Sequence, residues 1–306
     1  MKIAVIGTGM VGRLIAVELS KKYQVYAIDN NLNNLNLLIE YNPDIITRKI
    51  DILENEFLTD LRVDLVVNCV PGFMGFETSK RILEKKTCVD ISFMAEDCYE
   101  LEGHANKAGT ALYPDAGIAP GLSNIIVGNI ISNYDIDQIK ILVGGLPKER
   151  NPPWNYKAPF SPVDVIEEYT RPARIKLNGK TETVKALSGK FDFEMEEIGK
   201  LEAFLTDGLR TLLHSELTSG IPTLLEYTVR YPGHSSPFSE LIDSGRLEDS
   251  KIFKDGQSVS QREITIKNLL EEWKLSKNDK EFTLLIITAK TMDSGEITCV
   301  VYDEWR

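Results

Sequence analysis

The stretch Met1-Lys-Ile-Ala-Val-Ile-Gly7-Thr-Gly9-Met-Val-Gly12 opens the chain and decides its fold class. Residues 3–6 form an apolar run that is typical of a buried parallel strand, and apolar residues recur at helical spacing over residues 11–19. The three glycines therefore occupy the turn between a strand and a helix. In such a turn the first glycine permits the tight bend, the second lets the backbone approach a pyrophosphate, and the third lets the helix pack closely on the strand. The start of the helix directs unpaired N–H groups at the phosphates.

An acidic residue ends the next apolar run, Val25-Tyr-Ala-Ile-Asp29. A carboxylate at this place accepts hydrogen bonds from the adenosine ribose hydroxyls, and its charge repels a 2'-phosphate. Asp29 therefore favours NAD over NADP, a preference that the adjacent Asn30 and Asn31 can weaken. Together the turn and the acid predict a domain that binds NAD. A glycine turn that merely joins two elements is the alternative.

Strand and helix signals alternate up to Gly117, and this order predicts a Rossmann domain, a doubly wound parallel sheet, over residues 1–117. The expected strands cover residues 3–6, 24–28, 45–50, 65–70, 88–91 and 111–113. Ligands of such sheets bind at the carboxyl ends of the strands. The turns that follow the strands are therefore the places to look for further binding residues.

Two of these turns follow the third and fourth expected strands. Asp51 and Ile52 stand where an adenine ring is usually flanked, and Cys69-Val-Pro71-Gly72 stands where the nicotinamide end should lie. An ordinary strand end and a plain Pro-Gly turn are the competing interpretations. The residues that we expect to bind the cofactor are Gly7, Thr8, Gly9, Met10, Val11, Gly12, Asp29, Asn30, Asp51, Ile52, Cys69, Val70, Pro71 and Gly72.

The pattern changes after Gly117, where longer runs of alternating polarity appear. The expected strands cover residues 139–143, 183–187, 225–231, 282–289 and 297–302, and the expected helices cover residues 121–132, 207–214 and 261–273. This order predicts an α+β domain on a largely antiparallel sheet over residues 118–306. We expect this domain to bind the substrate and to carry the catalytic groups.

The composition argues against several classes of protein. The 306 residues carry a net charge of −11 and no stripe of lysine and arginine, so neither nucleic acid nor an anionic membrane is an expected partner. No apolar run approaches the roughly 20 residues that span a bilayer, and the early first strand leaves no room for a signal peptide. We expect no metal site, and reduced thiols in a cytoplasmic protein, because no disulfide or metal spacing is present among Cys69, Cys88, Cys98 and Cys299.

Nicotinamide chemistry requires a group that manages one proton. His234, in the stretch Thr228-Val-Arg230-Tyr-Pro-Gly-His234, is the first candidate base, because an imidazole with a pKa near 6.5 exchanges a proton at neutral pH. Asp90, at the end of the fifth expected strand, is the second candidate. A structural hydrogen-bonding role for the histidine, and turn formation or helix capping for the aspartate, stay open as alternatives.

Arginines are expected to grip a substrate carboxylate, because a guanidinium offers it two parallel hydrogen bonds. Arg230 ranks first, since other functional residue types surround it. The proline-rich and aromatic loop over residues 144–162 either covers the binding site, or its aromatic side chains pack beneath it or against a second subunit. The residues that we expect to bind the substrate are Ser92, Asp115, Gly117, Asn124, Tyr156, Arg171, Thr206, Asp207, Arg210 and Arg230.

Several motifs along the chain together resemble the saccharopine dehydrogenase-like family, and most closely its lysine 6-dehydrogenase branch. They are Asp115-Ala-Gly117-Ile-Ala-Pro120-Gly121, Gly144-Gly-Leu-Pro147, Asn155-Tyr156-Lys157, Phe160-Ser161-Pro162, Val165-Ile-Glu-Glu-Tyr169-Thr-Arg171-Pro172-Ala, Thr206-Asp207-Gly208-Leu-Arg210-Thr211 and Arg230-Tyr-Pro-Gly-His234. The resemblance covers nearly the whole chain. The joint occurrence of these motifs is far more specific than the glycine turn alone.

The resemblance implies an NAD-dependent dehydrogenase that oxidises the side-chain amine of lysine or a lysine-derived amino acid to an imine, which hydrolyses to a semialdehyde. The related alternative is a reductive condensation dehydrogenase of the saccharopine or carboxyspermidine type. Both reactions need a neutral amine, so a base must first remove a proton from the ammonium group. A small amino-acid substrate and a homodimer or dimer-based oligomer are further expectations.

The end of the sequence departs from this resemblance. Relatives of this type usually continue past the final hairpin into a segment with a Thr-Gly and an Ala-Met-Ala-Arg-like stretch, whereas this sequence stops at Tyr302-Asp-Glu-Trp-Arg306. If the segment closes the site, we expect a weak or divergent enzyme, or one that depends on a partner subunit. A non-catalytic NAD-binding homologue is therefore a third interpretation.

Overall fold

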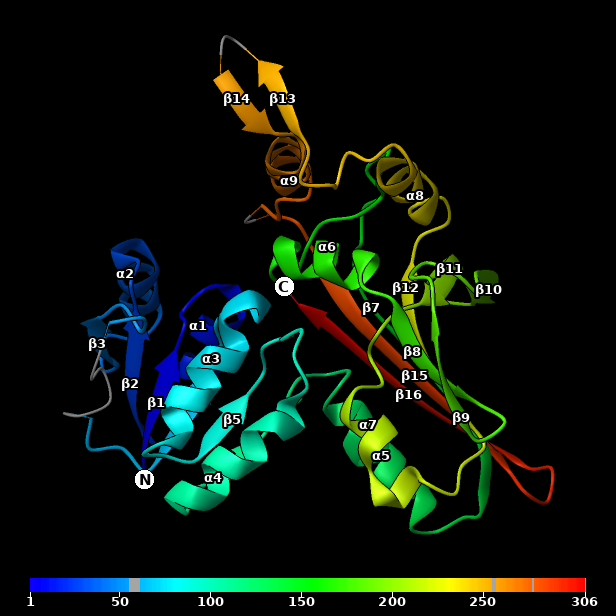
Figure 1. Ribbon diagram of the computed structural model, residues 1–306, viewed down its shortest axis with the longest axis horizontal. Helices are drawn as coiled ribbons and strands as arrows, with labels where there is room; N and C mark the ends of the chain where they lie inside the picture. Colours follow the sequence, from blue (N-terminus) through cyan, green and yellow to red (C-terminus); the bar gives the residue numbers. More distant parts are fainter. Residues whose placement is uncertain (55–60, 255–256, 277, 306) are drawn as a thin grey trace. The chain divides into compact units, whose positions relative to one another are not determined.

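The computed structural model describes residues 1–54, 61–254, 257–276 and 278–305. Contacts divide the chain into two compact units, Met1–Gly117 and Ile118–Arg306. Each unit has a sheet and apolar cores of its own, and Figure 1 names their elements.

The first unit is built on a parallel sheet whose strand order is β3-β2-β1-β4-β5-β6, of which Figure 1 labels β1, β2, β3 and β5. This order, which starts in the middle of the sheet and reverses after β3, is that of the Rossmann fold, so the predicted fold class is confirmed. All six expected strands form, within two residues at each end. They are β1 (Lys2–Ile6), β2 (Gln24–Asp29), β3 (Ile46–Lys49), β4 (Leu65–Asn68), β5 (Cys88–Asp90) and β6 (Leu112–Tyr113). The helices are α1 (Met10–Ser20), α2 (Leu32–Tyr41), α3 (Gly72–Leu83), the 3-10 helix η1 (Cys98–Leu101) and α4 (Glu102–Ala108).

β1 shows why the strands of this sheet read as continuous apolar runs. Ile3 and Val5 point to one face, where they share a core with side chains of α1 and α2. Ala4 and Ile6 point to the other face and share a core with side chains of α3 and α4. All four are at most 1% exposed. Because helices cover both faces, neither set of alternate residues needs to be polar.

The second unit is built on a mixed sheet in which β10-β11-β12-β7-β15-β16 lie in this order, with β8 paired to β12 and β9 paired to β8. β12 and β7 are parallel, whereas the other described pairs of this sheet are antiparallel, which confirms a largely antiparallel sheet. The strands are β7 (Ile136–Pro147), β8 (Ala173–Leu177), β9 (Lys180–Val184), β10 (Phe191–Met195), β11 (Gly199–Leu205), β12 (Thr223–Arg230), β15 (Glu281–Thr291) and β16 (Glu296–Trp305). A separate hairpin consists of β13 (Lys251–Lys254) and β14 (Gln257–Ser260).

Two predictions for this unit are wrong in part. The expected helix over residues 207–214 forms only as its last turn, because Arg210 adopts φ 40° and ψ −111°, outside the helical region. The strand expected over residues 183–187 ends at Val184, and Leu187 lies in the left-handed region with φ 62°. The helices are α5 (Leu122–Ile131), α6 (Pro162–Thr170), α7 (Thr211–His214), the 3-10 helix η2 (Glu216–Thr218), α8 (Ser235–Asp243) and α9 (Gln261–Glu272).

An aromatic core lies among α6, α8 and α9. It contains Trp154 and Tyr156 of the proline-rich loop, which are 8% and 1% exposed, with Tyr169 of α6, Phe238 of α8 and Trp273 after α9. Two further cores occupy opposite faces of the mixed sheet. The large aromatic side chains of the loop therefore pack beneath it, as one of the two interpretations of this loop requires.

In the part of the chain that the structure describes, no helix combines the length and the apolar character needed to cross a membrane.

Candidate active site

The glycine turn has the geometry that a pyrophosphate needs. Gly7 has φ +83°, and a Cβ added there would lie 2.7 Å from the carbonyl oxygen of Cys69. A Cβ on Gly12 would lie 1.9 Å from the carbonyl oxygen of Gly7, so the fold itself requires both glycines. A Cβ on Gly9 would have no heavy atom within 4 Å, which leaves this backbone open to a ligand. The turn therefore fits a dinucleotide.

The start of α1 completes this half of the site. Its N-cap is Gly9, which has no side chain to satisfy the first N–H groups of the helix. Met10 and Val11 are exposed beside it, whereas Thr8 is fully buried. An anion suits such a helix start, because its N–H groups and its dipole both favour negative charge.

Asp29 is 8% exposed and is held by the turn itself. Its Oδ2 accepts hydrogen bonds from the backbone N of Thr8 at 2.7 Å and from the Thr8 hydroxyl at 3.0 Å, and Asn34 Nδ2 lies 3.2 Å away. Its Oδ1 accepts from the backbone N of Asn31 at 2.7 Å. Thr8 therefore faces the carboxylate, and Asn30 is exposed beside it. The carboxylate is fixed in place at the end of β2, where a ribose would lie.

The other cofactor candidates lie in the turns after β3 and β4. Asp51 accepts a hydrogen bond from the backbone N of Leu53 at 2.9 Å, and Ile52 packs in the core at 7% exposure. The turn after β4 packs its backbone against Gly7, so the two turns form one surface. Val70 is also a core residue, Pro71 is the N-cap of α3, and Gly72 is its first residue.

Asp90 is fully buried at the end of β5 and accepts four hydrogen bonds. Asn68 Nδ2 and Ser79 Oγ donate to its Oδ2 at 2.7 and 2.5 Å, and the N and Oγ of Ser92 donate to its Oδ1 at 2.8 and 2.7 Å. Burial raises the pKa of this carboxyl, and the hydrogen bonds from Ser79 and Ser92 oppose the increase. Asp90 therefore joins β4, α3 and the loop after β5, which favours the turn-forming interpretation for Asp90, and Ser92 is one of the residues that donate to it.

The thiols near Asp90 are held in their protonated form. Burial, followed by the charge of Asp90, raises the pKa of Cys69 far above its ordinary value and that of Cys88 to about 12. No disulfide joins any of the four cysteines. Within the described ranges, no group of three or more histidine, cysteine or acidic side chains is arranged to hold a metal ion.

Three predicted substrate residues lie near the junction between the units. Asp115 is 6% exposed with φ 54°, and Gly117 is exposed. Asn124, in the first turn of α5, accepts from the backbone N of Gly121 at 3.4 Å and donates to Thr211 Oγ1 at 2.9 Å. Asn124 therefore ties the start of α5 to α7.

His234 lies fully buried in the aromatic core. Its Nδ1 is 2.9 Å from the carbonyl oxygen of Trp154, and its Nε2 is 3.0 Å from the Tyr169 hydroxyl. A carbonyl only accepts, so Nδ1 carries the hydrogen and Nε2 accepts from Tyr169. Burial and the nearby Arg230 charge lower the pKa of His234 to about 3. With both nitrogens engaged and the ring neutral, the geometry favours the structural role over that of a base.

Arg230 is 2% exposed and contacts the same Tyr169 hydroxyl as His234. Its Nε donates to the Tyr169 hydroxyl at 2.6 Å, and its Nη1 donates to the carbonyl of Val229 at 2.8 Å. The guanidinium carbon lies 4.6 Å from the ring centroid of Tyr156. Arg230 is thus an internal cation that fixes the direction of the hydrogen bond from Tyr169 to His234. The ring of Tyr156 packs against it.

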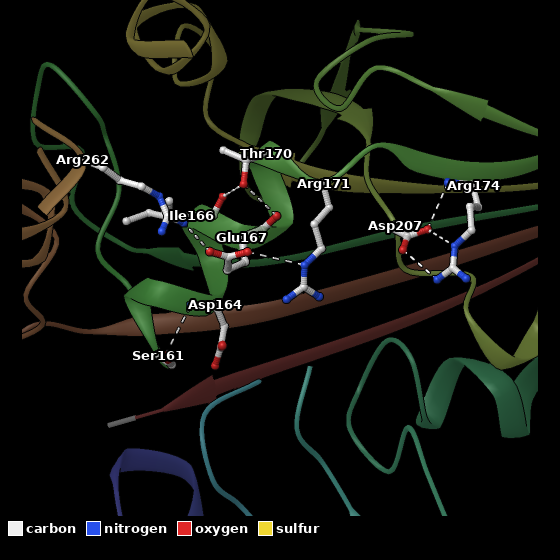
Figure 2. Close-up of polar contacts among 9 residues, drawn as sticks. All are labelled: Ser161, Asp164, Ile166, Glu167, Thr170, Arg171, Arg174, Asp207 and Arg262. Carbon is white, nitrogen blue, oxygen red and sulfur yellow. Dashed lines mark hydrogen bonds and ion pairs between the residues drawn. The ribbon is translucent and has the colours of Figure 1, made fainter. Parts of the chain in front are cut away.

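Figure 2 shows how the motif with Asp207 is anchored. Asp207 accepts from the backbone N, Nε and Nη2 of Arg174 at 3.0, 2.9 and 2.8 Å, so a residue that the sequence did not single out holds it. At the end of α6, Arg171 Nε lies 3.6 Å from the carboxylate of Glu167. Burial lowers the pKa of Arg171, and the charge of the buried Arg210 adds to this effect.

Two carboxyl groups that were not predicted from the sequence, those of Glu226 and Glu168, are connected to Thr206 by hydrogen-bond contacts. The Thr206 hydroxyl lies 2.7 Å from Glu226 Oε2 and 2.8 Å from the Thr228 hydroxyl, which in turn contacts Glu168 Oε1. Burial raises the pKa of Glu168 and raises that of Glu226 well above its ordinary value. The signal was present: Glu226 interrupts an apolar strand, Thr223-Leu-Leu-Glu-Tyr-Thr-Val.

The fold and the glycine turn define a class, the Rossmann proteins with a second α+β unit. Residues 3–112 match the family model described as the saccharopine dehydrogenase NADP binding domain, and residues 117–305 match the one described as the saccharopine dehydrogenase C-terminal domain. The chain therefore belongs to the saccharopine dehydrogenase family, and the resemblance seen in its motifs is confirmed.

Two curated relatives illustrate the similarity. The mitochondrial alpha-aminoadipic semialdehyde synthase of Rattus norvegicus is 25% identical over 266 residues, which cover 80% of this chain and 28% of that protein. The saccharopine dehydrogenase [NADP(+), L-glutamate-forming] of Saccharomyces cerevisiae is 23% identical over 233 residues, which cover 72% of this chain and 51% of that protein. The chain thus spans about half the length of the yeast relative and less than a third of the rat one.

Two solved structures share the fold. Apo saccharopine dehydrogenase (L-Glu forming) from Saccharomyces cerevisiae has a TM-score of 0.77 at 18% identity and covers 100% of this chain and 86% of that one. A probable dehydrogenase from Thermotoga maritima has a TM-score of 0.50 at 13% identity and covers 98% of this chain and 75% of that one.

Proposed function

We propose that the protein is an oxidoreductase that uses a nicotinamide dinucleotide to oxidise the side-chain amine of lysine or a lysine-derived amino acid. The product is an imine, which water hydrolyses to a semialdehyde. The observation that carries this proposal is the match to the two domains of one dehydrogenase family, over residues 3–112 and 117–305. The name of the yeast relative favours saccharopine as the first lysine-derived substrate to test.

The first unit supplies the cofactor site in this proposal. Gly7, Gly9 and Gly12 would hold the pyrophosphate against the start of α1, and Asp29 would meet the adenosine ribose. The bound dinucleotide supplies a hydride acceptor. The charge of Asp29 supports NAD, whereas the family model is named for NADP, so both cofactors belong in the test.

The second unit supplies the substrate site. The charges of Arg171 and Arg210 influence each other, so these two arginines are the pair that would bind a carboxylate in this proposal, and Arg230 donates to Tyr169 and to a backbone carbonyl. Since His234 is a buried neutral ring, the base that frees the amine lies elsewhere in this unit.

The test is turnover by the purified protein with NAD or NADP and with lysine, saccharopine or a carboxylated polyamine. Formation of reduced nicotinamide together with an aldehyde supports the proposal. The released amine identifies the reaction, because a primary amine yields ammonia and saccharopine yields a second amino acid. Tight cofactor binding without turnover on any of these amines would instead indicate the non-catalytic homologue. Sedimentation of the same sample tests the expected homodimer.

A further inference from the structure

Four side chains form a continuous series of oxygen atoms at β11, β12 and α6. The order is Glu226 Oε2, Thr206 Oγ1, Thr228 Oγ1 and Glu168 Oε1, and each neighbouring pair is within hydrogen-bond distance. The Thr206-Asp207-Gly208 motif builds one end. The backbone N of Gly208 donates to Glu226 Oε2 at 3.1 Å, and a Cβ on Gly208 would lie 2.4 Å from the Glu226 carboxyl carbon.

The three contacts in this series determine how many hydrogen atoms lie between its oxygen atoms. Three oxygen-to-oxygen contacts need three hydrogens, but the two threonine hydroxyls supply only two. If both glutamates were ionised, each hydroxyl would donate to its own carboxylate and the contact between Thr206 and Thr228 would have no hydrogen. A proton on one of the two carboxyl groups supplies the third hydrogen, and the series then carries a single negative charge.

The surroundings place that proton on Glu226. An Oε2 hydroxyl of Glu226 can accept from Gly208 and donate to Thr206 at once, which is compatible with the distances of both contacts. Glu168 instead lies beside the positive charge of Arg230, which stabilises its ionised form. The hydrogen bonds then run from Glu226 through Thr206 and Thr228 to the carboxylate of Glu168.

Glu168 is the least buried member of the series. Thr206, Thr228 and Glu226 are at most 2% exposed, whereas Glu168 on α6 is only half-buried. Arg171, the C-cap residue of α6, follows Glu168 by three residues, at the end of the helix that carries Glu168. An amino acid carries an amine and a carboxylate, the charges that complement this pair.

We propose that Glu168 is the base that frees the substrate amine, and that Glu226, Thr206 and Thr228 are positioning residues that keep the single negative charge on it. This role rests on the proposed function. In the step, an N–H bond of the substrate ammonium breaks, its proton forms an O–H bond on Glu168, and the electron pair stays on nitrogen. The amine becomes neutral and so does Glu168, and no oxidant takes part before hydride transfer.

The number of hydrogens is tested without turnover, by infrared difference spectroscopy of the carbonyl stretch at neutral pH. Subtracting the Glu226→Gln variant from the parent protein should leave the band of one protonated carboxyl. The matched control Glu271→Gln removes an exposed carboxylate and should leave a carboxylate band only. A carboxylate band in the Glu226→Gln difference would overturn the proposal.

Kinetics test the base. Glu168→Gln should lower kcat/KM at pH 7 by at least about 100-fold, the lower end of what a general base contributes. The loss should shrink about tenfold per pH unit as free amine becomes available from solution. Thr206→Val should lower kcat/KM less, and Thr206→Ser, which keeps the hydroxyl, should restore it. Each variant should keep the parental circular-dichroism spectrum and the parental unfolding transition, which shows that the second unit, where the substitutions lie, is folded.

An equal loss for Glu168→Gln at every pH from 7 to 10 would show a merely structural role and overturn the assignment. A parent protein without turnover on any amine would contradict the proposed function and the base together, whereas the infrared result would still decide where the proton lies.

Discussion

Adding one methyl group at Gly9 should weaken dinucleotide binding, whereas adding one at Gly12 should lower the stability of the fold. The two glycines stand three residues apart in one turn, but their surroundings differ. An alanine methyl at position 9 would have no heavy atom within 4 Å, and Gly9 has φ −62°, which alanine adopts freely. At position 12 the methyl would lie 1.9 Å from the carbonyl oxygen of Gly7 and 2.9 Å from Cys69 Cβ.

These distances set the expected magnitudes. Gly12→Ala forces backbone apart, so its cost should reach or exceed the upper end of the roughly 1–3 kcal/mol seen for overpacking. Gly9→Ala should change the free energy of unfolding by no more than about 1 kcal/mol, since lower chain entropy in the unfolded state opposes the weaker N-cap. The same methyl would occupy the approach of the pyrophosphate, and a tenfold loss of affinity corresponds to about 1.4 kcal/mol. We expect at least that loss.

Urea denaturation gives the stability of each variant, and isothermal titration calorimetry gives the affinity for NAD and NADP. The reasoning predicts a stable Gly9→Ala protein that binds poorly and a Gly12→Ala protein that is markedly less stable. Unchanged affinity in Gly9→Ala would refute the assignment of this turn to the pyrophosphate. Parental stability in Gly12→Ala would refute the contact with Gly7.

The remaining predictions concern single side chains in both units. Asp29→Asn removes the charge that disfavours a 2'-phosphate, so the ratio of NAD to NADP affinity, measured by calorimetry, should fall at least tenfold; an unchanged ratio would contradict this role. His234 stays neutral in the folded state down to a pKa of about 3 but takes up a proton near pH 6.5 when unfolded. As the pH falls through this window the unfolded state binds more protons, so the parent should lose about 1.4 kcal/mol of stability per pH unit relative to His234→Gln, and parallel stability curves would contradict this. Arg174→Lys replaces a bidentate contact with Asp207 by a point charge on a side chain that is 33% exposed, so urea denaturation should show a loss of about 1 kcal/mol, and no loss would mean that the pair contributes nothing.

The fold of the first unit could be predicted almost entirely from the sequence, because neighbouring residues in the sequence determine each of its strands and turns. Each strand is a short apolar run, each turn carries glycine or proline, and the order of strands follows from the alternation with helices. The roles of the three glycines also follow from the turn type. Burial of Ile52 and Val70 was not visible, since an apolar residue after a strand reads the same in a core and in a binding surface.

The second unit was harder, because its strands are polar or partly exposed. β9 and β10 contain alternating charged residues that leave no apolar run, and both were absent or misplaced in the prediction. α6 was missed because Pro162 follows the proline-rich loop, although Ser161 caps the helix and Pro162 suits its first position. Sequence spacing also cannot show that Thr206, Glu226 and Glu168 meet, since they come from three separate elements.

The environment of His234 shows why residue type alone is a weak guide to a catalytic base. An imidazole suits proton transfer only if one nitrogen faces a substrate, and here a carbonyl and a phenol occupy both. A glutamate that reads as an ordinary helix residue becomes the stronger candidate once its proton balance is counted, because three contacts and two hydroxyls leave one charge at the least buried end. A catalytic base is distinguished by a negative charge that its hydrogen-bond donors satisfy only in part. Only the three-dimensional arrangement reveals this property.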